Sequence, residues 1–360
     1  MGKGRELSAT ELGPVISDVS DKLFSEQSPP SLPPCNSLLS STENSPKELV
    51  SFESMIQQTT PSAVETFASE PCVNIQQISE EERKRLQPLL WLELSSIFDK
   101  NHVCLEKQKA FKRMRKDKGN VFGVSLNTLV RRELLVAGEH TTGLVPLVLQ
   151  VILAELTVRG VLEEGILRVP GHKKQTEAMC NEIENFFYSM PEKIDSLIKN
   201  APVHDLSALL KCWLRELPQP LLSNDLLHIF YQTNVLPSQD QNQAMAILWQ
   251  LLPDENRDTL RELLNFFRRV VEHHHINKMT QQNVARIIAP SFFPPRFLHP
   301  LDKNDIGAQV RMTVQCCHLT NVLLTMADSL WLVPQRLVEQ SKTIKKNGQL
   351  AKTSVNTKNQ

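Results

Sequence analysis

The sequence predicts an all-α protein in which a helical bundle domain follows a disordered N-terminal region, and three observations favour this fold class. The 360 residues include only 12 glycines and 2 tyrosines, which is few for a sheet protein with many tight turns. Apolar residues recur at helical spacing across most of the chain after Leu144. No run of alternating polar and apolar residues is long enough to require a strand. A hydrophobic content of 41% is sufficient for a packed core in one or two domains.

The N-terminal segment is acidic and rich in serine and proline. Residues 1–80 carry 11 acidic and 4 basic side chains, and their apolar residues come singly without a period. Such a segment buries too little apolar surface to offset the entropy of ordering it, so residues 1–78 are predicted to be disordered. The Ser28-Pro29 and Ser45-Pro46 steps are either phosphorylation sites or parts of a solvated tail.

Residues 79–121 are predicted to form a helix and a basic linker. Ser79 and Glu82 match a capping box, in which the serine accepts from first-turn N–H groups while the glutamate reaches back, and the helix continues through Ile97. Seven lysines and arginines then fall within residues 107–118. This basic run is open to four interpretations: a nuclear import signal, a nucleic-acid contact, an acidic-lipid contact or a solvated linker.

Amphipathic stripes dominate the remaining chain and predict one all-helical domain at residues 122–332. The clearest stripe follows Pro253 and ends near His273, with arginine and glutamate on its polar face. Similar stripes run through Leu144 to Val158, Gln175 to Phe187, His204 to Leu217, Asp225 to Val235, Gln239 to Leu252 and Val310 to Met326. Residues 333–360 are assigned to the end of a C-terminal helix and a polar tail.

The sequence lacks the motifs of several kinds of metal-binding and nucleotide-binding site. The seven cysteines are scattered without a C-x-x-C pair, which is typical of reduced thiols in an intracellular protein and predicts no zinc site. Residues 273–275 are three adjacent histidines that point in different directions on a helix, so they are interpreted as surface residues. Neither a Walker motif nor a G-x-G-x-x-G loop is present, so any nucleotide belongs to a partner.

The expected location follows from the absence of a signal peptide or membrane-spanning segment in this sequence. We expect the protein in the cytoplasm. The basic run at residues 107–118 would allow contact with an acidic membrane surface, at the cell cortex or the periphery of the plasma membrane.

One candidate site residue is an arginine on a short loop. Two glycines six residues apart, Gly165 and Gly171, together with Pro170, stop the preceding helix. The apolar neighbours of Arg168 would anchor this loop while the guanidinium points outward. Taken alone, the motif is equally compatible with an ordinary surface arginine.

Two further motifs carry candidate binding residues. Lys211 and Arg215 lie four residues apart, off the apolar stripe of their helix, and therefore share another face. Asn283 lies in the first turn of a helix with a threonine N-cap at Thr280. Pro290 is predicted to end that helix and to shape a groove. Each feature is commonplace on its own, since such polar residues usually line a solvated face.

Together, in this order, the three motifs resemble the Rho GTPase-activating protein (RhoGAP) domain. The family has a G-x-x-R-x-x-G loop, a helix that reads L-L-K-x-x-x-R-E-L-P-x-P-L, and an N-K-M-x-x-x-N segment followed by a proline, and this sequence contains all three. The segments at residues 91–99, 122–126 and 330–334 are also similar to the group that contains Rho GTPase-activating proteins 18, 28 and 40. The resemblance implies a RhoGAP-like helical bundle.

The resemblance also implies a function. The chain would accelerate GTP hydrolysis by a Rho-family GTPase in its GTP state, with Arg168 as an arginine finger supplied in trans. Lys211 and Arg215 would brace the finger loop and line the GTPase-facing surface, while Asn283 and Pro290 would contact the partner. No cofactor is expected in the chain itself, because the GTPase carries GTP and Mg²⁺. The group favours Rho over Rac and Cdc42 and points to control of the actin cytoskeleton.

The sequence departs from the family pattern after the Asn283 helix begins. Ala289 precedes Pro290 where many members have glycine, Arg286 replaces an apolar or small residue, and Pro294, Pro295 and Arg296 are less familiar. None of these changes removes a group that acts in the transition state. They bear on the choice of partner instead.

Two other functions stay open at this point. The first is a Rho-binding module without catalysis, against which Arg168 argues. The second is a helical nucleic-acid binder that uses residues 107–118. That run has a single aromatic residue, Phe111, so it lacks the stacking platform such a binder needs, and no nucleic-acid partner is expected.

Overall fold

The computed structural model describes residues 70–105, 117–137, 144–298 and 305–343. The predicted disorder of residues 1–69 and most of the basic run, residues 106–116, lie outside the described residues. The described elements are, in chain order, strand β1 (Cys72–Asn74), the 3-10 helix η1 (Ile75–Gln77), helices α3 (Glu80–Lys100), α4 (Leu126–Ala137), α5 (Leu147–Arg159), α6 (Lys173–Phe186), α7 (Pro191–Asn200), α8 (Val203–Glu216) and α9 (Leu227–Gln232), the 3-10 helix η3 (Thr233–Val235), helices α10 (Ser238–Leu251), α11 (Asp254–Glu272), α12 (His274–Asn277), α13 (Gln281–Phe292) and α14 (Ile306–Met326), and strand β2 (Leu332–Pro334). Residues 335–343 are also helical.

The all-α prediction is confirmed, apart from one short pair of antiparallel strands among the described residues. In this pair Cys72 lies opposite Pro334, Val73 opposite Val333 and Asn74 opposite Leu332. Each strand has three residues, which is too short for an alternating pattern to show in the sequence. The predicted C-terminal segment at 333–360 therefore begins inside a strand, not inside a helix.

The pairing also moves the start of the folded region. The predicted disordered region ended at residue 78, but residues 70–78 are part of the fold. Ile75 and Ile78 are buried, and the Ile75 N–H donates to the Trp331 carbonyl at 2.8 Å. The single apolar residues in this stretch gave no periodic signal, yet they fill the space beside β2.

Helix α3 begins as predicted at the Ser79 capping box. The Glu82 N–H donates to Ser79 Oγ at 3.3 Å, and the Ser79 N–H donates to Glu82 Oε2 at 3.2 Å. Its apolar face packs against α10, whereas Leu92 stays exposed. An ion pair between Lys100 Nζ and Asp240 Oδ1, 3.0 Å apart, joins the C-terminal end of α3 to the first turn of α10. The N-terminal helix is therefore part of the same core as the bundle.

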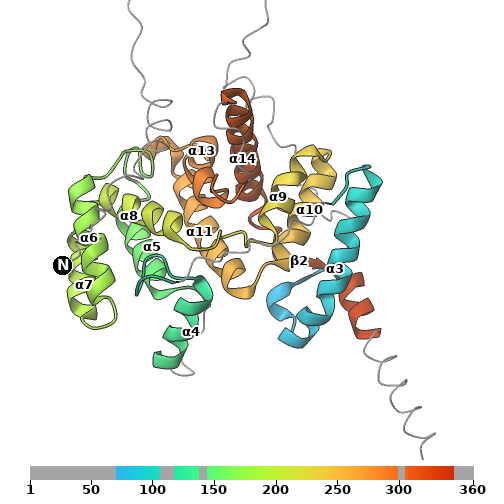
Figure 1. Ribbon diagram of the computed structural model, residues 1–360, viewed down its shortest axis with the longest axis horizontal. Coiled ribbons are helices and arrows are strands. Elements are labelled where there is room, and N and C mark those ends of the chain that lie inside the picture. The colour runs from blue at the N-terminus through green and yellow to red at the C-terminus, as the bar shows by residue number, and fades with distance from the viewer. Residues whose placement is uncertain (1–69, 106–116, 138–143, 299–304, 344–360) are drawn as a thin grey trace, which may run out of the picture. The chain divides into compact units, whose positions relative to one another are not determined.

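Helix α11 lies in the middle of the described elements, with α5 and α8 to one side of it and α9 and α10 to the other in Figure 1. It matches the clearest predicted stripe, and Leu260, Leu263 and Phe267 on that stripe are buried. Helices α4, α5, α13 and α14 all pack against it. Four helices therefore pack around this one, as in a helical bundle.

Helices α4, α7 and the four-residue α12 were not predicted, and two other helices have different lengths from those expected. Helix α7 is a ten-residue helix with Pro191 in its first turn and only two buried side chains, Ile194 and Ile198. Helix α4 follows Ser125, whose Oγ accepts from the Thr128 N–H at 3.3 Å. The predicted helix from Asp225 to Val235 is shorter and ends as a 3-10 helix, and α14 starts four residues before Val310. No helix among the described residues is long and apolar enough to cross a membrane.

Candidate functional site

The arginine loop connects α5 to α6 and presents Arg168 to solvent. Ile166 and Leu167 are completely buried, whereas Arg168 is exposed, as the sequence predicted. Leu167 adopts a left-handed backbone with φ of 69°, and Gly165 has the same φ. A leucine in this conformation costs about 1 kcal/mol or more, so the surrounding contacts must hold it there.

Asn277, at the end of α12, fixes the beginning of the loop. Its side chain is fully buried and donates to the carbonyls of Val161 and Val270, each at 2.7 Å. Its Oδ1 accepts from the Met279 N–H at 2.8 Å, and its own carbonyl accepts from the Gly165 N–H at 2.8 Å. One residue therefore joins the loop to α11 and to the segment that leads into α13.

Lys211 fixes the middle of the loop. This residue lies on α8, and its Nζ donates to the Leu167 carbonyl at 2.5 Å. Leu167, whose carbonyl accepts this bond, has the left-handed φ and directly precedes Arg168 in the chain. Lys211 therefore connects α8 to the arginine loop.

Asp205, also on α8, fixes the end of the loop. Its carboxylate is fully buried, and Oδ1 accepts from the His172 N–H at 2.6 Å. Gly171 passes so close that an added Cβ would lie 2.7 Å from the same oxygen. A larger residue at position 171 would push this end of the loop away from α8. The loop is thus attached at both ends and beside Arg168.

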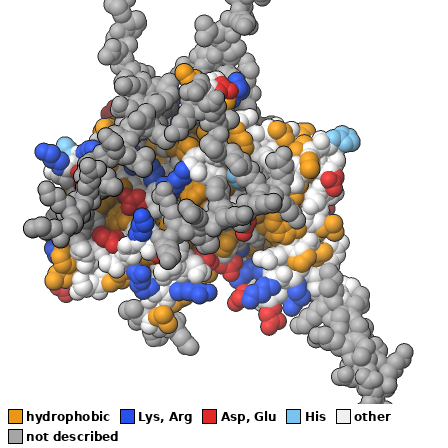
Figure 2. All heavy atoms as spheres, viewed as in Figure 1, with side chains coloured by type: hydrophobic (Ala, Val, Ile, Leu, Met, Phe, Trp, Pro, Cys, Tyr) orange, Lys and Arg blue, Asp and Glu red, His pale blue; other side chains and the backbone are white. Residues whose placement is uncertain are grey.

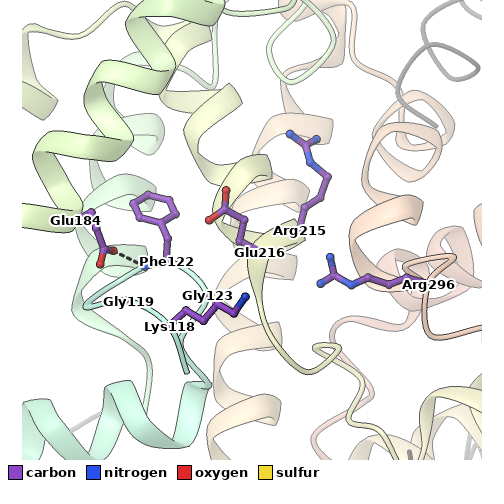
Figure 3. A pocket seen from close by; sticks show the side chains of 8 residues that line it. All are labelled: Lys118, Gly119, Phe122, Gly123, Glu184, Arg215, Glu216 and Arg296. Atoms are coloured by element: carbon purple, nitrogen blue, oxygen red, sulfur yellow. Dashed lines mark hydrogen bonds between the residues drawn. The ribbon is translucent and has the colours of Figure 1, made fainter. Parts of the chain in front are cut away.

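Arg215 lies one helical turn beyond Lys211, at the edge of an open pocket. The pocket has a volume of about 380 Å³. Its lining comes from four parts of the chain: Lys118, Gly119, Phe122 and Gly123 before α4, Glu184 on α6, Arg215 and Glu216 on α8, and Arg296 after α13 (Figure 3). Of the site residues predicted from sequence, only Arg215 borders this pocket.

Asn283 and Pro290 lie on α13, which packs against α8. Thr280 caps this helix as predicted, since its Oγ1 accepts from the Asn283 N–H at 3.3 Å. Pro290 does not end the helix, which continues to Phe292. The proline lies in the last turn, where its missing N–H costs only one helical bond. It is exposed and about 10 Å along the helix axis from Asn283.

One thiol lies directly beside Lys211. Cys212 follows Lys211 on α8, and a hydrogen bond to Cys180, together with burial, raises the pKa of the Cys212 thiol. Its Sγ also donates to Glu216 Oε1 at 3.2 Å. The thiol is therefore protonated at neutral pH and serves as a hydrogen-bond donor.

No group of three metal-ligating side chains converges within the part of the chain that the structure describes. Two of the adjacent histidines bond to backbone instead: Nδ1 of His273 lies 2.8 Å from the Arg269 carbonyl, and Nδ1 of His274 lies 3.0 Å from the Val271 carbonyl. The described site offers buried bonds and exposed cations, but no assembled ligand set for a metal.

Sequence reasoning missed Asn277, Asp205 and the two basic residues Lys118 and Arg296 as parts of this site. Asn277 is the first residue of the third motif and Asp205 lies in the second, but the sequence analysis assigned neither residue a function. Asn277 and Asp205 are distinguished by the burial of their polar side chains, which spacing along a helix does not reveal.

Comparison with known proteins identifies a domain that contains the central part of this site. Residues 146–297 match the RhoGAP domain family. The match includes the arginine loop, α8 and α13. It excludes α3, α14 and both strands, which lie outside these limits.

Individual relatives extend the similarity beyond that domain. The chain is 54% identical over 264 residues to Rho GTPase-activating protein conundrum of Drosophila melanogaster and 34% identical over 266 residues to Rho GTPase-activating protein 18 of Homo sapiens. Each alignment covers 73% of this chain, but only 42% and 38% of these two relatives. Among solved structures, human Rho GTPase-activating protein 15 aligns with a TM-score of 0.49 and 21% identity, over 62% of this chain and 99% of that one.

The domain match covers the three predicted motifs, and the relatives in the alignments include the predicted group. Rho GTPase-activating proteins 40 and 28 of Mus musculus are 35% and 27% identical to this chain over the same share of its length. The chain therefore carries a RhoGAP domain and is homologous to conundrum and to Rho GTPase-activating proteins 18, 28 and 40.

Proposed function

We propose that this chain accelerates GTP hydrolysis by a Rho-family GTPase by inserting Arg168 into the GTPase active site. The observation that supports this most directly is the contrast within the arginine loop. Arg168 is exposed, while the backbone on both sides of it is held by part-buried hydrogen bonds to the side chains of Lys211 and Asp205. An arginine presented on a fixed loop loses little conformational entropy when it enters a partner.

The chemistry assigned to Arg168 is stabilisation of charge that develops on the transferring phosphoryl group. A small GTPase binds GTP and Mg²⁺ itself but neutralises this charge incompletely, and an arginine supplied in trans is worth roughly 10³ to 10⁵ in rate. The planar guanidinium can bond to phosphate oxygens and a backbone carbonyl at once, which a lysine cannot. The chain needs no cofactor in this proposal and is an activator of the GTPase rather than an enzyme with a substrate of its own.

The other predicted residues have supporting roles in this proposal. Lys211 positions the loop through the Leu167 carbonyl, while Arg215, Asn283 and Pro290 contact the GTPase. Rho is the favoured partner over Rac and Cdc42, with the GTP state bound preferentially. We place the activity in the cytoplasm and the cell cortex, with the basic run at 107–118 as the contact to an acidic membrane surface.

The test is single-turnover GTP hydrolysis by purified Rho, Rac and Cdc42 at increasing concentrations of the chain. Arg168→Ala should lower the maximal stimulated rate by roughly 10² to 10⁴, about 3 to 5 kcal/mol, and change the half-saturating concentration much less. Lys84→Ala, which removes one exposed positive charge on α3, serves as the control and should leave both values unchanged.

Two results would contradict this proposal. If the wild-type chain binds the GTP-loaded GTPase without accelerating hydrolysis, it is a non-catalytic Rho-binding module. If a folded Arg168→Ala variant stimulates hydrolysis at the wild-type rate, Arg168 is not the finger. Circular dichroism and the melting temperature of each variant exclude unfolding as the cause.

Nucleic-acid binding remains the weaker alternative. Figure 2 shows lysine and arginine side chains interspersed with aspartate and glutamate on the visible face, without an extended basic area among the coloured residues. Such a mixture does not provide the electrostatic footprint of a nucleic-acid groove. Binding to random oligonucleotides at physiological salt would reverse this conclusion.

A further inference from the structure

The open pocket beside Arg215 gathers three cations from separate parts of the chain. Lys118 precedes α4, Arg215 ends α8, and Arg296 follows α13. Figure 3 shows the ends of the Lys118 and Arg296 side chains pointing towards one another across the pocket. Like charges that converge on open space repel one another, and an anion placed between them would relieve that repulsion.

Arg296 is held in place at this position. Its Nη2 donates to the Leu217 carbonyl at 2.7 Å, and its guanidinium carbon lies 4.8 Å from the centre of the Phe297 ring. By contrast, neither Lys118 nor Arg215 has an ion-pair partner in the described part of the chain. The pocket therefore has one fixed cation and two whose charges remain available.

The lining also contains two carboxylates beside its three cations. Glu184 accepts from the backbone N–H groups of Asn120, Val121 and Phe122, at distances of 2.5 to 3.0 Å. Glu216 accepts from the Cys212 thiol. Three basic and two acidic side chains leave a net charge of +1, which suits one carboxylate better than a doubly charged phosphate.

The pocket begins next to the residues that hold the arginine loop. Arg215 and Lys211 are four residues apart on α8, so the pocket edge lies about 6 Å along the helix axis from the bond that fixes Leu167. A protein that receives Arg168 would meet this edge too. Arg296 also belongs to the part of the sequence that departs from the family pattern.

We propose that this pocket receives an aspartate or glutamate side chain of the GTPase, and that Lys118 and Arg296 thereby determine which Rho-family member is bound. The proposal rests on the proposed function and adds a basis for partner choice. A pocket of about 380 Å³ accommodates a protruding acidic residue with its adjoining backbone and water. Its contribution is made equally in the ground and transition states, so it acts on affinity rather than on the rate within the complex.

The experiment compares Lys118→Glu with Lys84→Glu in single-turnover hydrolysis by Rho, Rac and Cdc42. Both variants change the charge by the same amount, but Lys84 is exposed on α3 and lies outside the pocket. Lys118→Glu should raise the half-saturating concentration about tenfold for the preferred GTPase, with the maximal rate unchanged. Lys84→Glu should change neither. Arg296→Gln should repeat the affinity loss, and its melting temperature shows whether the bond to Leu217 was needed for folding.

A second arm identifies the acidic partner residue. Acidic surface residues of the preferred GTPase are changed to lysine one at a time, and each variant is tested against wild-type chain and Lys118→Glu. One GTPase variant should lose affinity for the wild-type chain and regain it with Lys118→Glu, which a double-mutant cycle records as coupling.

The possible results separate this inference from the proposed function. If the wild-type chain stimulates no GTPase, the proposed function fails. If the wild-type chain stimulates hydrolysis and Lys118→Glu has an unchanged half-saturating concentration for every GTPase, the pocket inference fails alone. It also fails if Lys118→Glu leaves that value unchanged but abolishes sedimentation with phosphatidylcholine–phosphatidylserine vesicles, because the pocket then binds lipid.

Discussion

At the scale of single residues, the buried Asn277 connects the arginine loop to α11 and to the segment that leads into α13. Its four hydrogen bonds reach Val161, Gly165, Val270 and Met279. Because three of them use the side chain, Asn277→Ala leaves buried carbonyl and N–H groups without partners. We expect the free energy of unfolding to fall by about 2 to 4 kcal/mol and the maximal stimulated rate to fall as the loop loosens. Urea unfolding and single-turnover hydrolysis below the unfolding transition measure the two effects.

Asn185→Ala is the matched control for this prediction. Asn185 also donates through its side-chain amide to a carbonyl, that of Asn181 at 2.8 Å, but it lies on the exposed side of α6. Its removal should change the free energy of unfolding by less than about 0.5 kcal/mol. Equal losses from both variants would show that burial of Asn277 has no special importance.

A second residue, His318 on α14, makes stability depend on pH. Its Nε2 lies 3.0 Å from Gln241 Oε1, and burial lowers its pKa below the ordinary value of 6.5. The unfolded chain then binds the proton more tightly than the folded protein does. Stability is complete above the unfolded pKa and is lost as the pH falls through it towards the folded pKa.

His318→Gln should remove this dependence. The variant retains a donor for Gln241 but does not titrate, so its free energy of unfolding should fall less between about pH 7.5 and about pH 5.5 than that of the wild type. Urea unfolding at the two pH values measures the difference. Parallel pH profiles for the two proteins would show that another group is responsible.

At the scale of elements, Glu184 attaches the segment before α4 to α6. Its carboxylate accepts from three consecutive backbone N–H groups, those of residues 120–122. Gly119 lies so close that an added Cβ would be 2.6 Å from Glu184 Oε1. Glu184→Gln replaces one acceptor oxygen with a donor that faces other donors. We expect the free energy of unfolding to fall by about 1.5 to 3 kcal/mol in urea unfolding.

The control for this prediction lies on the same helix. Glu177 is exposed on α6 and forms no hydrogen bond or ion pair in the described structure, so Glu177→Gln should change stability by less than about 0.5 kcal/mol. If Glu184→Gln were equally mild, water would be satisfying the three N–H groups as well as the carboxylate does.

The elements also show what could be predicted from the sequence. Wide apolar stripes predicted helices such as α11, because most of their length packs against the core. Helix α7 was missed because its ten residues bury only two side chains, although Pro191 marks its start. The β1–β2 pair was missed because its partners lie at opposite ends of the described chain, and local sequence contains no signal for such pairing.

The candidate site shows the same limit. The exposure of Arg168 followed from its apolar neighbours, which are adjacent in sequence. The bonds of Asn277 and Asp205 to the loop depend on where α12 and α8 pack, so only the folded structure brings these residues into the site. Partner selection through the pocket depends on four segments of the chain meeting, which no single motif encodes.

At the scale of the whole molecule, residues 70–78 are integral to the fold. Two chains that begin at residue 70 and at residue 79 provide the test. The shorter chain lacks β1 and the buried side chains of Ile75 and Ile78, so its free energy of unfolding should be lower by about 3 kcal/mol or more. Thermal and urea unfolding of the two chains make the comparison. Equal stability would show that the folded region begins at Ser79.

The register of the strand pair has a mechanical consequence. Cys72 and Pro334 form its outer end, where β1 begins and where β2 continues into the helix at residues 335–343. Tension applied through the two flanking segments would load that end first, together with the bond from Gln335 to the Pro71 carbonyl. The strands would then unzip one pair at a time instead of resisting in shear. A modest pull would therefore release residues 70–78, about 30 Å of extended chain, while the arginine loop stayed attached to its helices.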